Sequence, residues 1–237
     1  MLLLGLVLAT MVAMATAATT SPSRRGRRGG SQQAVPEPRP RRDGLDLTPS
    51  CVGDGKADCT ECLQEAINTA TCQNRPAPCT TQTLLLPAGI YMVSSQLNAP
   101  HDPPLRLMGD GYAESVITAS RPMAAVLNFT CLSGPGVAPA GGAATPRPIE
   151  GVYIGDLTIS ANKLANYSIF APGMARSRFN RVKVDGALIV GLSLGFGWCN
   201  YIEGCRFGGN GIGLHTYNSA NNIDVIDCIF EANYQGE

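Results

Sequence analysis

Charged side chains that could act on a substrate recur in the last quarter of the 237-residue chain. Lys183 and Arg206 occupy equivalent positions of a sequence repeat, with Asp185 and Asp227 close by. A Lys, Arg, His or Tyr base can remove the proton next to a carboxylate, provided that a cation neutralises that carboxylate. The cation can be a basic side chain or Ca²⁺. Lys183 and Arg206 are therefore candidates for an elimination on an acidic substrate, with Ca²⁺ left open.

Carboxylates in the same stretch offer a second chemistry. Hydrolysis of a glycosidic bond takes two carboxyl groups at a defined separation, which Asp224, Asp227 and Glu231 could supply. The other candidates are a base formed by His215 with Tyr217, and the substrate contacts Arg181 and Asp185. Outward charges on such a strand also fit a solvated surface, and His215 also fits a turn, so both interpretations stay open.

The candidates lie on a repeat that is visible in the sequence. Three apolar columns recur with steps of 25, 23 and 23 residues, a period that predicts stacked coils. The columns are Ile154, Phe179, Ile202 and Val225; Leu157, Val182, Cys205 and Cys228; and Ile159, Val184, Phe207 and Phe230. We expect these residues to face inward, and Lys183 and Arg206 between them to face outward. A fourth column predicts a ladder of hydrogen-bonded amides: Asn162, Ala187, Asn210 and Asn233.

One helix precedes the strands. Leu63, Ala66, Ile67 and Ala70 fall on one helical face, and Asp58 with Glu61 resembles a capping box. Short β segments follow at 83–86, 91–93, 105–108 and 116–118. The pattern predicts an all-β solenoid whose first coil is capped by a helix.

Three segments carry a family resemblance: GDGKADCTECLQEAI from Gly53, LLLPAGIYMVSSQL from Leu84 and LRLMGDGYAESVI from Leu105. They resemble the opening of the pectate-lyase-like superfamily, of the rhamnogalacturonase/epimerase type. The resemblance implies a single-stranded right-handed parallel β-helix with an N-terminal capping helix, and a protein directed at carbohydrate. Cys59 stands where the family usually has Asp. The NTD, DD, GHG and RIK motifs of polygalacturonases and the DPHE element of alginate epimerases do not occur, so no catalytic set carries over.

Three regions follow from composition. Residues 1–17 are expected to be a signal peptide, because an apolar run from Leu2 to Ala13 precedes Ala15-Thr16-Ala17; a transit peptide is the alternative. Residues 18–45 are expected to be a disordered Arg/Pro/Gly-rich linker. Residues 46–237 form the β-helix, with the cap and first coils in 46–148 and regular coils in 149–237. Because nothing resembling a polar cap follows the last coil, we expect this domain to be C-terminally incomplete.

Charge and cysteines narrow the function classes. From Gly44 onward the chain has 11 basic and 16 acidic residues, which gives no reason to expect a nucleic-acid partner, and no segment of the mature chain is expected to span a membrane. Five of the nine cysteines surround the N-terminal helix, which favours disulfides over a zinc site. Cys205 and Cys228 could be buried thiols or a bridge. Asn128 and Asn166 begin glycosylation triplets.

The sequence therefore predicts a secreted β-helix that acts on extracellular polysaccharide, as a lyase or hydrolase of uronate-containing chains. A non-catalytic β-helix for carbohydrate binding or surface structure is the alternative. No cofactor is expected with certainty. If Lys183 and Arg206 hold an acidic sugar chain, its binding should weaken as salt screens the charges.

Overall fold

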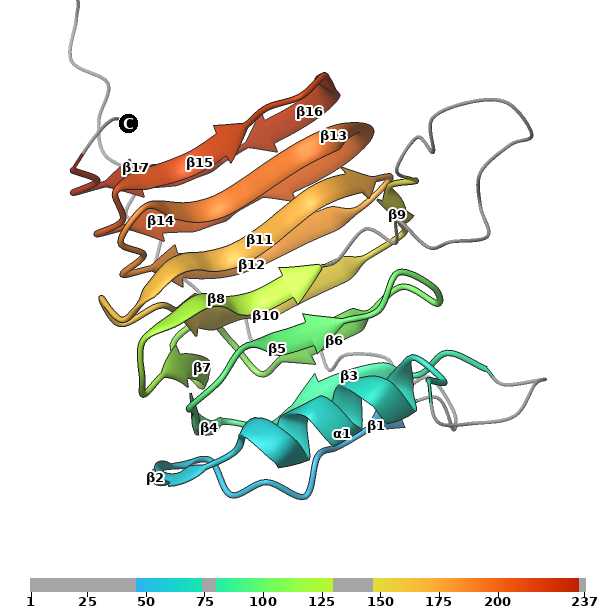
Figure 1. The fold of residues 1–237 in the computed structure, drawn as a ribbon, viewed down its shortest axis with the longest axis vertical. Helices are drawn as coiled ribbons and strands as arrows, with labels where there is room; N and C mark the ends of the chain where they lie inside the picture. Colours follow the sequence, from blue (N-terminus) through green and yellow to red (C-terminus); the bar gives the residue numbers. More distant parts are fainter. Residues whose placement is uncertain (1–45, 74–79, 130–146, 235–237) are drawn as a thin grey trace, which may run out of the picture. The chain divides into compact units, whose positions relative to one another are not determined.

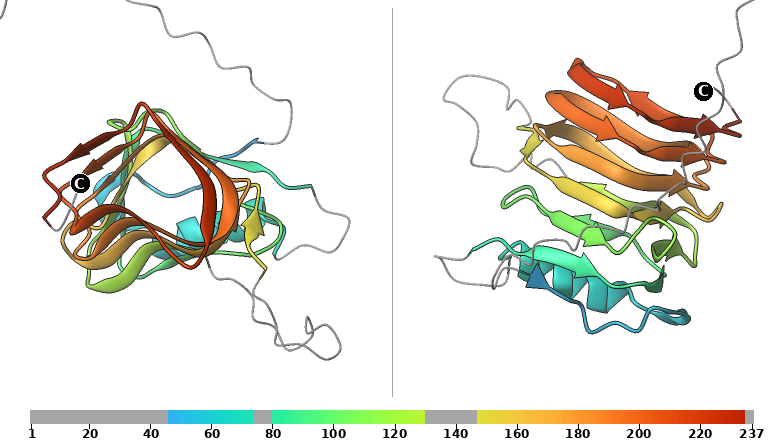
Figure 2. Two further views of the ribbon diagram at one scale, coloured as in Figure 1. Left: turned by 90° about the horizontal axis from the view of Figure 1, so that it is seen from above. Right: turned by 180° about the vertical axis from the view of Figure 1, so that it is seen from behind.

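Short parallel strands stacked in successive coils make up the fold (Figures 1 and 2). The computed structural model describes residues 46–73, 80–129 and 147–234. The predicted signal peptide (1–17) and linker (18–45) lie outside the described residues. Within them the predicted parallel β-helix is confirmed, with helix α1 (Thr60–Ala70) at the N-terminal end of the stack.

Two parallel sheets form the walls of the coils. Sheet A contains β1 (Asp46–Leu47), β2 (Asp54–Asp58), β3 (Thr83–Leu86), β4 (Gly89–Val93), β6 (Arg106–Gly109), β7 (Ser115–Ala119), β10 (Tyr153–Ser160), β12 (Arg178–Asp185), β14 (Arg206–Gly208), β16 (Ala220–Ile226), β17 (Ile229–Glu231) and the end of β13 (Val190–Glu203). Sheet B contains β5 (Leu97–Ala99), β8 (Met123–Phe129), β11 (Ala165–Ala175), the start of β13 and β15 (Ile212–Thr216). Strand β9 (Ile149–Glu150) pairs with the end of β11.

The predicted inward columns are confirmed by the strand register. Ile154 pairs with Phe179, Phe179 with Ile202, and Val184 with Phe207. These side chains are at most 1% exposed. The inward residues of the inner coils are covered by their equivalents one coil away, so the core is a stack along the coil axis. Val225, in the last described coil, is 44% exposed.

A left-handed residue bends sheet A in each regular coil. Asp156, Arg181, Gly204 and Asp227 have φ of 57°, 51°, 60° and 50°. The bend separates each coil of sheet A into a first row, from β3 through β6 to the end of β13 and β16, and a second row, from β4 through β7 to β14 and β17. The outward side chains of the two rows therefore form two distinct surfaces.

The asparagine ladder is confirmed where two amides are stacked. Asn210 Nδ2 donates to Asn233 Oδ1 (3.2 Å) and to the carbonyl of Val184 (3.1 Å). Its Oδ1 accepts the amide of Ala187 (3.0 Å). Asn210 is fully buried, so these bonds satisfy backbone groups at the turn between sheets A and B.

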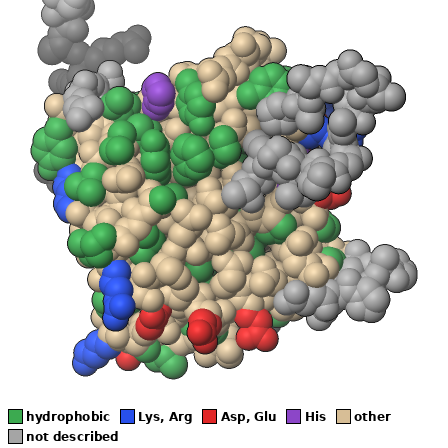
Figure 3. Space-filling model, viewed as in Figure 1, with side chains coloured by type: hydrophobic (Ala, Val, Ile, Leu, Met, Phe, Trp, Pro, Cys, Tyr) green, Lys and Arg blue, Asp and Glu red, His purple; other side chains and the backbone are tan. Residues whose placement is uncertain are grey.

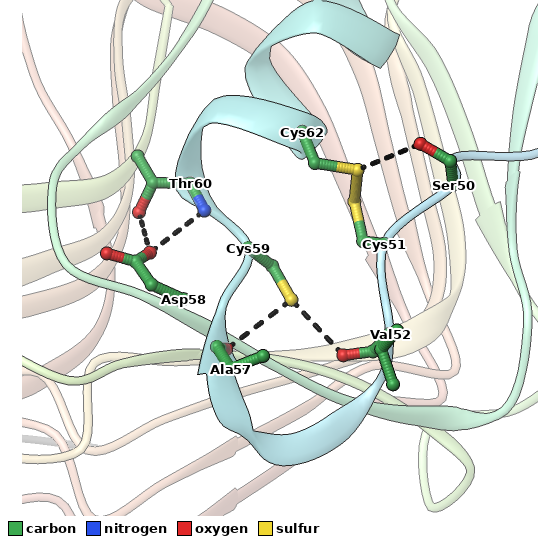
Figure 4. Close-up of a disulfide and its surroundings, with 8 residues drawn as sticks. All are labelled: Ser50, Cys51, Val52, Ala57, Asp58, Cys59, Thr60 and Cys62. Atoms are coloured by element: carbon green, nitrogen blue, oxygen red, sulfur yellow. Dashed lines mark hydrogen bonds between the residues drawn. A yellow bond between two sulfur atoms is a disulfide. The ribbon is translucent and has the colours of Figure 1, made fainter.

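The helix buries the face that the sequence predicts: Leu63, Ala66, Ile67 and Ala70. The predicted capping box is wrong, because the N-cap is Cys59 and it makes no side-chain cap bond. Asp58 Oδ1 instead accepts the amide and hydroxyl of Thr60 (3.0 and 2.5 Å), as Figure 4 shows, and Oδ2 accepts the hydroxyl of Ser94. These hydrogen bonds, that from Ser94 first, lower the pKa of Asp58 to about 2.

The predicted disulfides near the N-terminal helix are confirmed for three cysteines. Cys51 and Cys62 form a disulfide that joins the chain before β2 to helix α1 (Figure 4), and Cys72 is also disulfide-bonded. Cys59 is a buried free thiol. The alternatives for Cys205 and Cys228 are resolved in favour of free thiols. Burial raises the pKa of the Cys205 thiol to about 12.

Candidate functional site

The outward side chains of the second row line a groove that crosses successive coils. Thr158, Lys183 and Arg206 follow one another in register, and Ser160 pairs with Asp185 in the adjacent column. Two hollows of about 410 and 430 Å³ lie over these positions and share Ser160, Lys183 and Asp185. We call the two hollows together the groove. Its other lining residues include Ile90, Tyr112, Val116, Thr118, Gly208 and Glu231.

Two cations of the groove, Lys183 and Arg206, have carboxylate partners, whereas Lys163 donates to the carbonyl of Gly209 and lies over the Tyr234 ring. Lys183 Nζ lies 2.7 Å from Asp185 Oδ2. Arg206 binds Glu231 through two parallel hydrogen bonds of 2.5 and 2.8 Å, which raise the pKa of Arg206 and lower that of Glu231. The structure thus confirms that Lys183 and Arg206 are stacked neighbours. It also shows their charges compensated, so the groove is polar without being strongly basic.

Asp185 is a partly accessible carboxylate of the groove. Its Oδ2 is bound to Lys183, and its side chain is 23% exposed. Its Oδ1 is buried and has no hydrogen-bond partner among the residues that the structure describes. A buried acceptor without a donor is unfavourable by about 1–3 kcal/mol.

The other acidic candidates and Arg181 lie off the groove. Arg181 sits at the bend and binds Asp156 through two bonds of 2.6 and 2.8 Å; the hydrogen bond with Asp156 raises the pKa of Arg181. Its guanidinium therefore joins two coils, and the Arg181 side chain is 56% exposed. Asp227 occupies the same bend position two coils later. Asp224 lies in the first row, where it pairs with Tyr201.

His215 and Tyr217 belong to the other sheet. His215 pairs with Ser193 in sheet B, and its ring stacks on Tyr217 with centroids 5.5 Å apart. The structure therefore separates this predicted base from the groove of sheet A. Hydrophobic side chains gather on this face over β11, β13 and β15, with a histidine at their margin (Figure 3). The ring pairs Tyr167–Phe170 and Phe196–Trp198 extend the aromatic surface.

The two glycosylation candidates differ in access. Asn128 is 7% exposed and its Nδ2 donates to Asn98 Oδ1 (3.0 Å), so the folded chain does not present it as an acceptor. Asn166 is exposed at the start of β11. Only Asn166 remains a candidate in the folded protein.

One column of outward residues in the first row was not predicted from the sequence. Arg106, Tyr153, Arg178 and Tyr201 follow one another in register. Arg106 lies 5.4 Å from the centre of the Tyr153 ring, and Arg178 lies 5.4 Å from that of Tyr201. The signal was available, because Tyr153, Arg178 and Tyr201 each stand one residue before a member of the first inward column.

The described residues contain no group of three or more His, Cys, Asp or Glu side chains that could hold a metal ion. No helix in ranges 46–73, 80–129 and 147–234 is long and apolar enough to cross a membrane.

The family resemblance is confirmed by comparison with known proteins. Residues 49–147 match the family described as rhamnogalacturonase A/epimerase, pectate lyase-like. This segment contains the cap and first coils, so this part of the chain is similar to the pectate-lyase-like family. No curated protein matches the chain in sequence.

Solved structures share the fold at low sequence identity. ORF18 of Geobacillus virus E2 has a TM-score of 0.62 and 19% identity, over 81% of this chain and 40% of that one. The N-terminal fragment of bacteriophage Phi29 gene product 12 has a TM-score of 0.51 and 14% identity, over 75% and 34%. The A-module of the Azotobacter vinelandii mannuronan C-5 epimerase AlgE4 has a TM-score of 0.49 and 19% identity, over 78% and 48%. The chain matches less than half of the length of each of these structures.

Proposed function

We propose that this protein is secreted and binds a uronate-containing extracellular polysaccharide along the outward face of sheet A. The observation that carries the proposal is the groove, in which polar side chains from successive coils line one continuous track. Asp185, whose side chain is 23% exposed in the groove, offers a sugar hydroxyl an acceptor. The Cys51–Cys62 disulfide supports an oxidising compartment.

A variant whose groove is blocked tests this proposal. Ser160 lies where the two hollows meet, so Ser160→Trp should fill the track and weaken polysaccharide binding. Ser95→Trp is the matched control, because Ser95 is exposed in the turn after β4. Binding is measured by titration calorimetry against acidic and neutral polysaccharides. Equal binding by both variants, or no binding by the parent chain to any polymer, would overturn the proposed function.

Glycoside hydrolysis is the second candidate, and one observation favours it. Asp185 and Glu231 lie in the same outward column, with Gly208 between them. Two coils place their Cα atoms about 9.6 Å apart at the usual strand spacing of about 4.8 Å. The carboxyl groups of inverting glycosidases are about 6.5–9.5 Å apart, a separation that the two side chains reach by leaning toward each other. Arg206 lowers the pKa of Glu231 and so keeps Glu231 ionised, as a general base must be, and Asp185 is the second carboxyl group of the pair.

One series of assays distinguishes catalysis from binding without catalysis. Hydrolysis and elimination both release reducing ends, whereas only elimination gives the ultraviolet absorbance of an unsaturated uronate. If Asp185 and Glu231 catalyse hydrolysis, Glu231→Gln should abolish reducing-end release while polymer binding persists. If Glu231→Gln releases reducing ends as the parent does, Asp185 and Glu231 are excluded as the catalytic pair. If the parent releases no reducing ends, polysaccharide binding is the function that remains.

A further inference from the structure

The first row of sheet A carries a column of alternating arginine and tyrosine on its outward side. Arg106, Tyr153, Arg178 and Tyr201 succeed one another over four coils. Each guanidinium faces the ring one coil further along, at 5.4 Å in both cases. A planar guanidinium stacked on an aromatic face keeps its N–H groups directed outward in its own plane. The stacking therefore orders both arginines and leaves their donors available.

The arginines of this column lack the carboxylate partners that Lys183 and Arg206 have in the groove. Arg176, Arg181, Lys183 and Arg206 each have a carboxylate within 4 Å. Arg106 and Arg178 have none among the described residues. Within the column the acids are Asp46 and Asp224, each two coils from the nearer arginine. In the adjacent column, Glu203 accepts a hydrogen bond from Asn180 (3.2 Å).

The surface is accessible and its shape is fixed by close packing. Arg178 is exposed, and Tyr201 is 40% exposed. Tyr153 lies across its own strand above Gly155, where an added Cβ would come within 2.8 Å of the ring. Glycine at this position therefore lets the ring lie flat beside Arg106.

We infer that the column Arg106–Tyr153–Arg178–Tyr201 binds the carboxylates of an acidic polysaccharide, which deepens the proposed function by naming the residues that select acidic chains. Carboxylates accept two parallel hydrogen bonds from one guanidinium. The two arginines are separated by two coils, about 9.6 Å at a strand spacing of about 4.8 Å, which is close to the length of a disaccharide. A uronate chain lying along the coil axis would present carboxylates to both.

A single-stranded nucleic acid is the competing polyanion. Its recognition relies on bases stacking on free aromatic faces. In this column Tyr153 and Tyr201 each have one ring face covered by a guanidinium, and the chain as a whole is not basic. The geometry therefore favours the glycan, and competition by a nucleic acid becomes an outcome of the test.

The experiment compares two exposed arginines in the intact chain. Arg178→Gln removes a charge from the column, and Arg121→Gln removes one from the turn before β8, away from the column. Binding of polygalacturonate is measured by calorimetry at low and at physiological salt. Arg178→Gln should lower the affinity about tenfold, as expected for the loss of a charge-assisted bidentate contact, and reduce the salt dependence. Arg178→Lys should restore only part of the affinity, because an ammonium lacks the planar pair of donors.

The affinities and the competition experiment decide whether the column binds the acidic chain. Equal affinities of Arg178→Gln and Arg121→Gln, or displacement of polygalacturonate by single-stranded DNA at lower concentration than by polygalacturonate itself, would overturn the inference. Thermal unfolding of the variants controls for folding, since exposed charges contribute little to stability. If Arg178→Gln bound polygalacturonate as the parent does while Ser160→Trp weakened that binding, the column would be overturned and the proposed function kept. If Ser160→Trp and Ser95→Trp bound the acidic polysaccharide equally, the proposed function would fail whatever the result for Arg178→Gln.

Discussion

Replacing Phe207 with alanine tests the inward stack at its most buried aromatic contact. Phe207 is fully buried in β14. Its ring lies 4.9 Å from that of Phe230, at 14° between planes, and Val184 is its register partner one coil below. A buried phenylalanine replaced by alanine loses about 3–5 kcal/mol. Against a total of about 5–15 kcal/mol, this is a large fraction of the free energy of unfolding.

The adjacent outward residue is the matched control. Arg206 lies on the same strand, and its ion pair with Glu231 is half-exposed, with side chains 43% and 41% accessible. Such exposed pairs contribute little to stability, so Arg206→Ala should unfold nearly as the parent does. In urea the free energy of unfolding falls by about 2 kcal/mol per molar, so Phe207→Ala should lower the urea concentration at the unfolding midpoint by about 2 M.

Circular dichroism at increasing urea gives both midpoints. Phe207→Asp should be more damaging than Phe207→Ala, because it adds an unpaired carboxylate to the apolar stack. If the variants at Phe207 and Arg206 lost the same stability, the assignment of inward and outward positions would be wrong.

Three further predictions concern the cap and the core. Replacing Cys62 with alanine opens the disulfide, whose cysteines are 11 residues apart, and should cost about 2–3 kcal/mol, seen as a lower melting temperature; an unchanged value would contradict this. Because hydrogen bonds from Ser94 and Thr60 lower the pKa of Asp58 to about 2, its contribution is present above the unfolded pKa of about 4. The free energy of unfolding should fall as the pH drops from about 4 to 2, and Asp58→Asn should reduce this pH dependence. Burial raises the pKa of Cys205 to about 12, so mass spectrometry should find it alkylated at pH 8 only after unfolding.

Local sequence patterns were sufficient to predict the helix and the inward columns of the regular coils. The apolar period placed four residues on the buried face of α1, and the columns of Phe179 and Val184 matched the register. These predictions succeed because a helix face and a stacked strand repeat both depend on residues at fixed spacing along the chain. The strands β5 and β8 were missed, since they lie in the less regular early coils.

The cap and the site show where sequence patterns are insufficient. Asp58 and Glu61 have capping-box spacing, yet Asp58 binds Thr60 and Ser94, the latter being 36 residues away along the chain. His215 and Tyr217 have the chemistry of a base, yet the turn between the sheets places them on sheet B. Which acid neutralises which cation also depends on contacts across coils.

The sequence by itself determined the coil period, the inward residues, the asparagine turn and the neighbourhood of Lys183 and Arg206, because each of these repeats along one dimension. Only the tertiary structure decided how the outward charges are paired. Arg181 binds Asp156, Arg206 binds Glu231, and Arg106 and Arg178 stack on tyrosines instead. The physical reason is that a side chain's partner lies one coil away in space but more than twenty residues away in sequence, so charge compensation depends on the direction each side chain takes at the bend of sheet A.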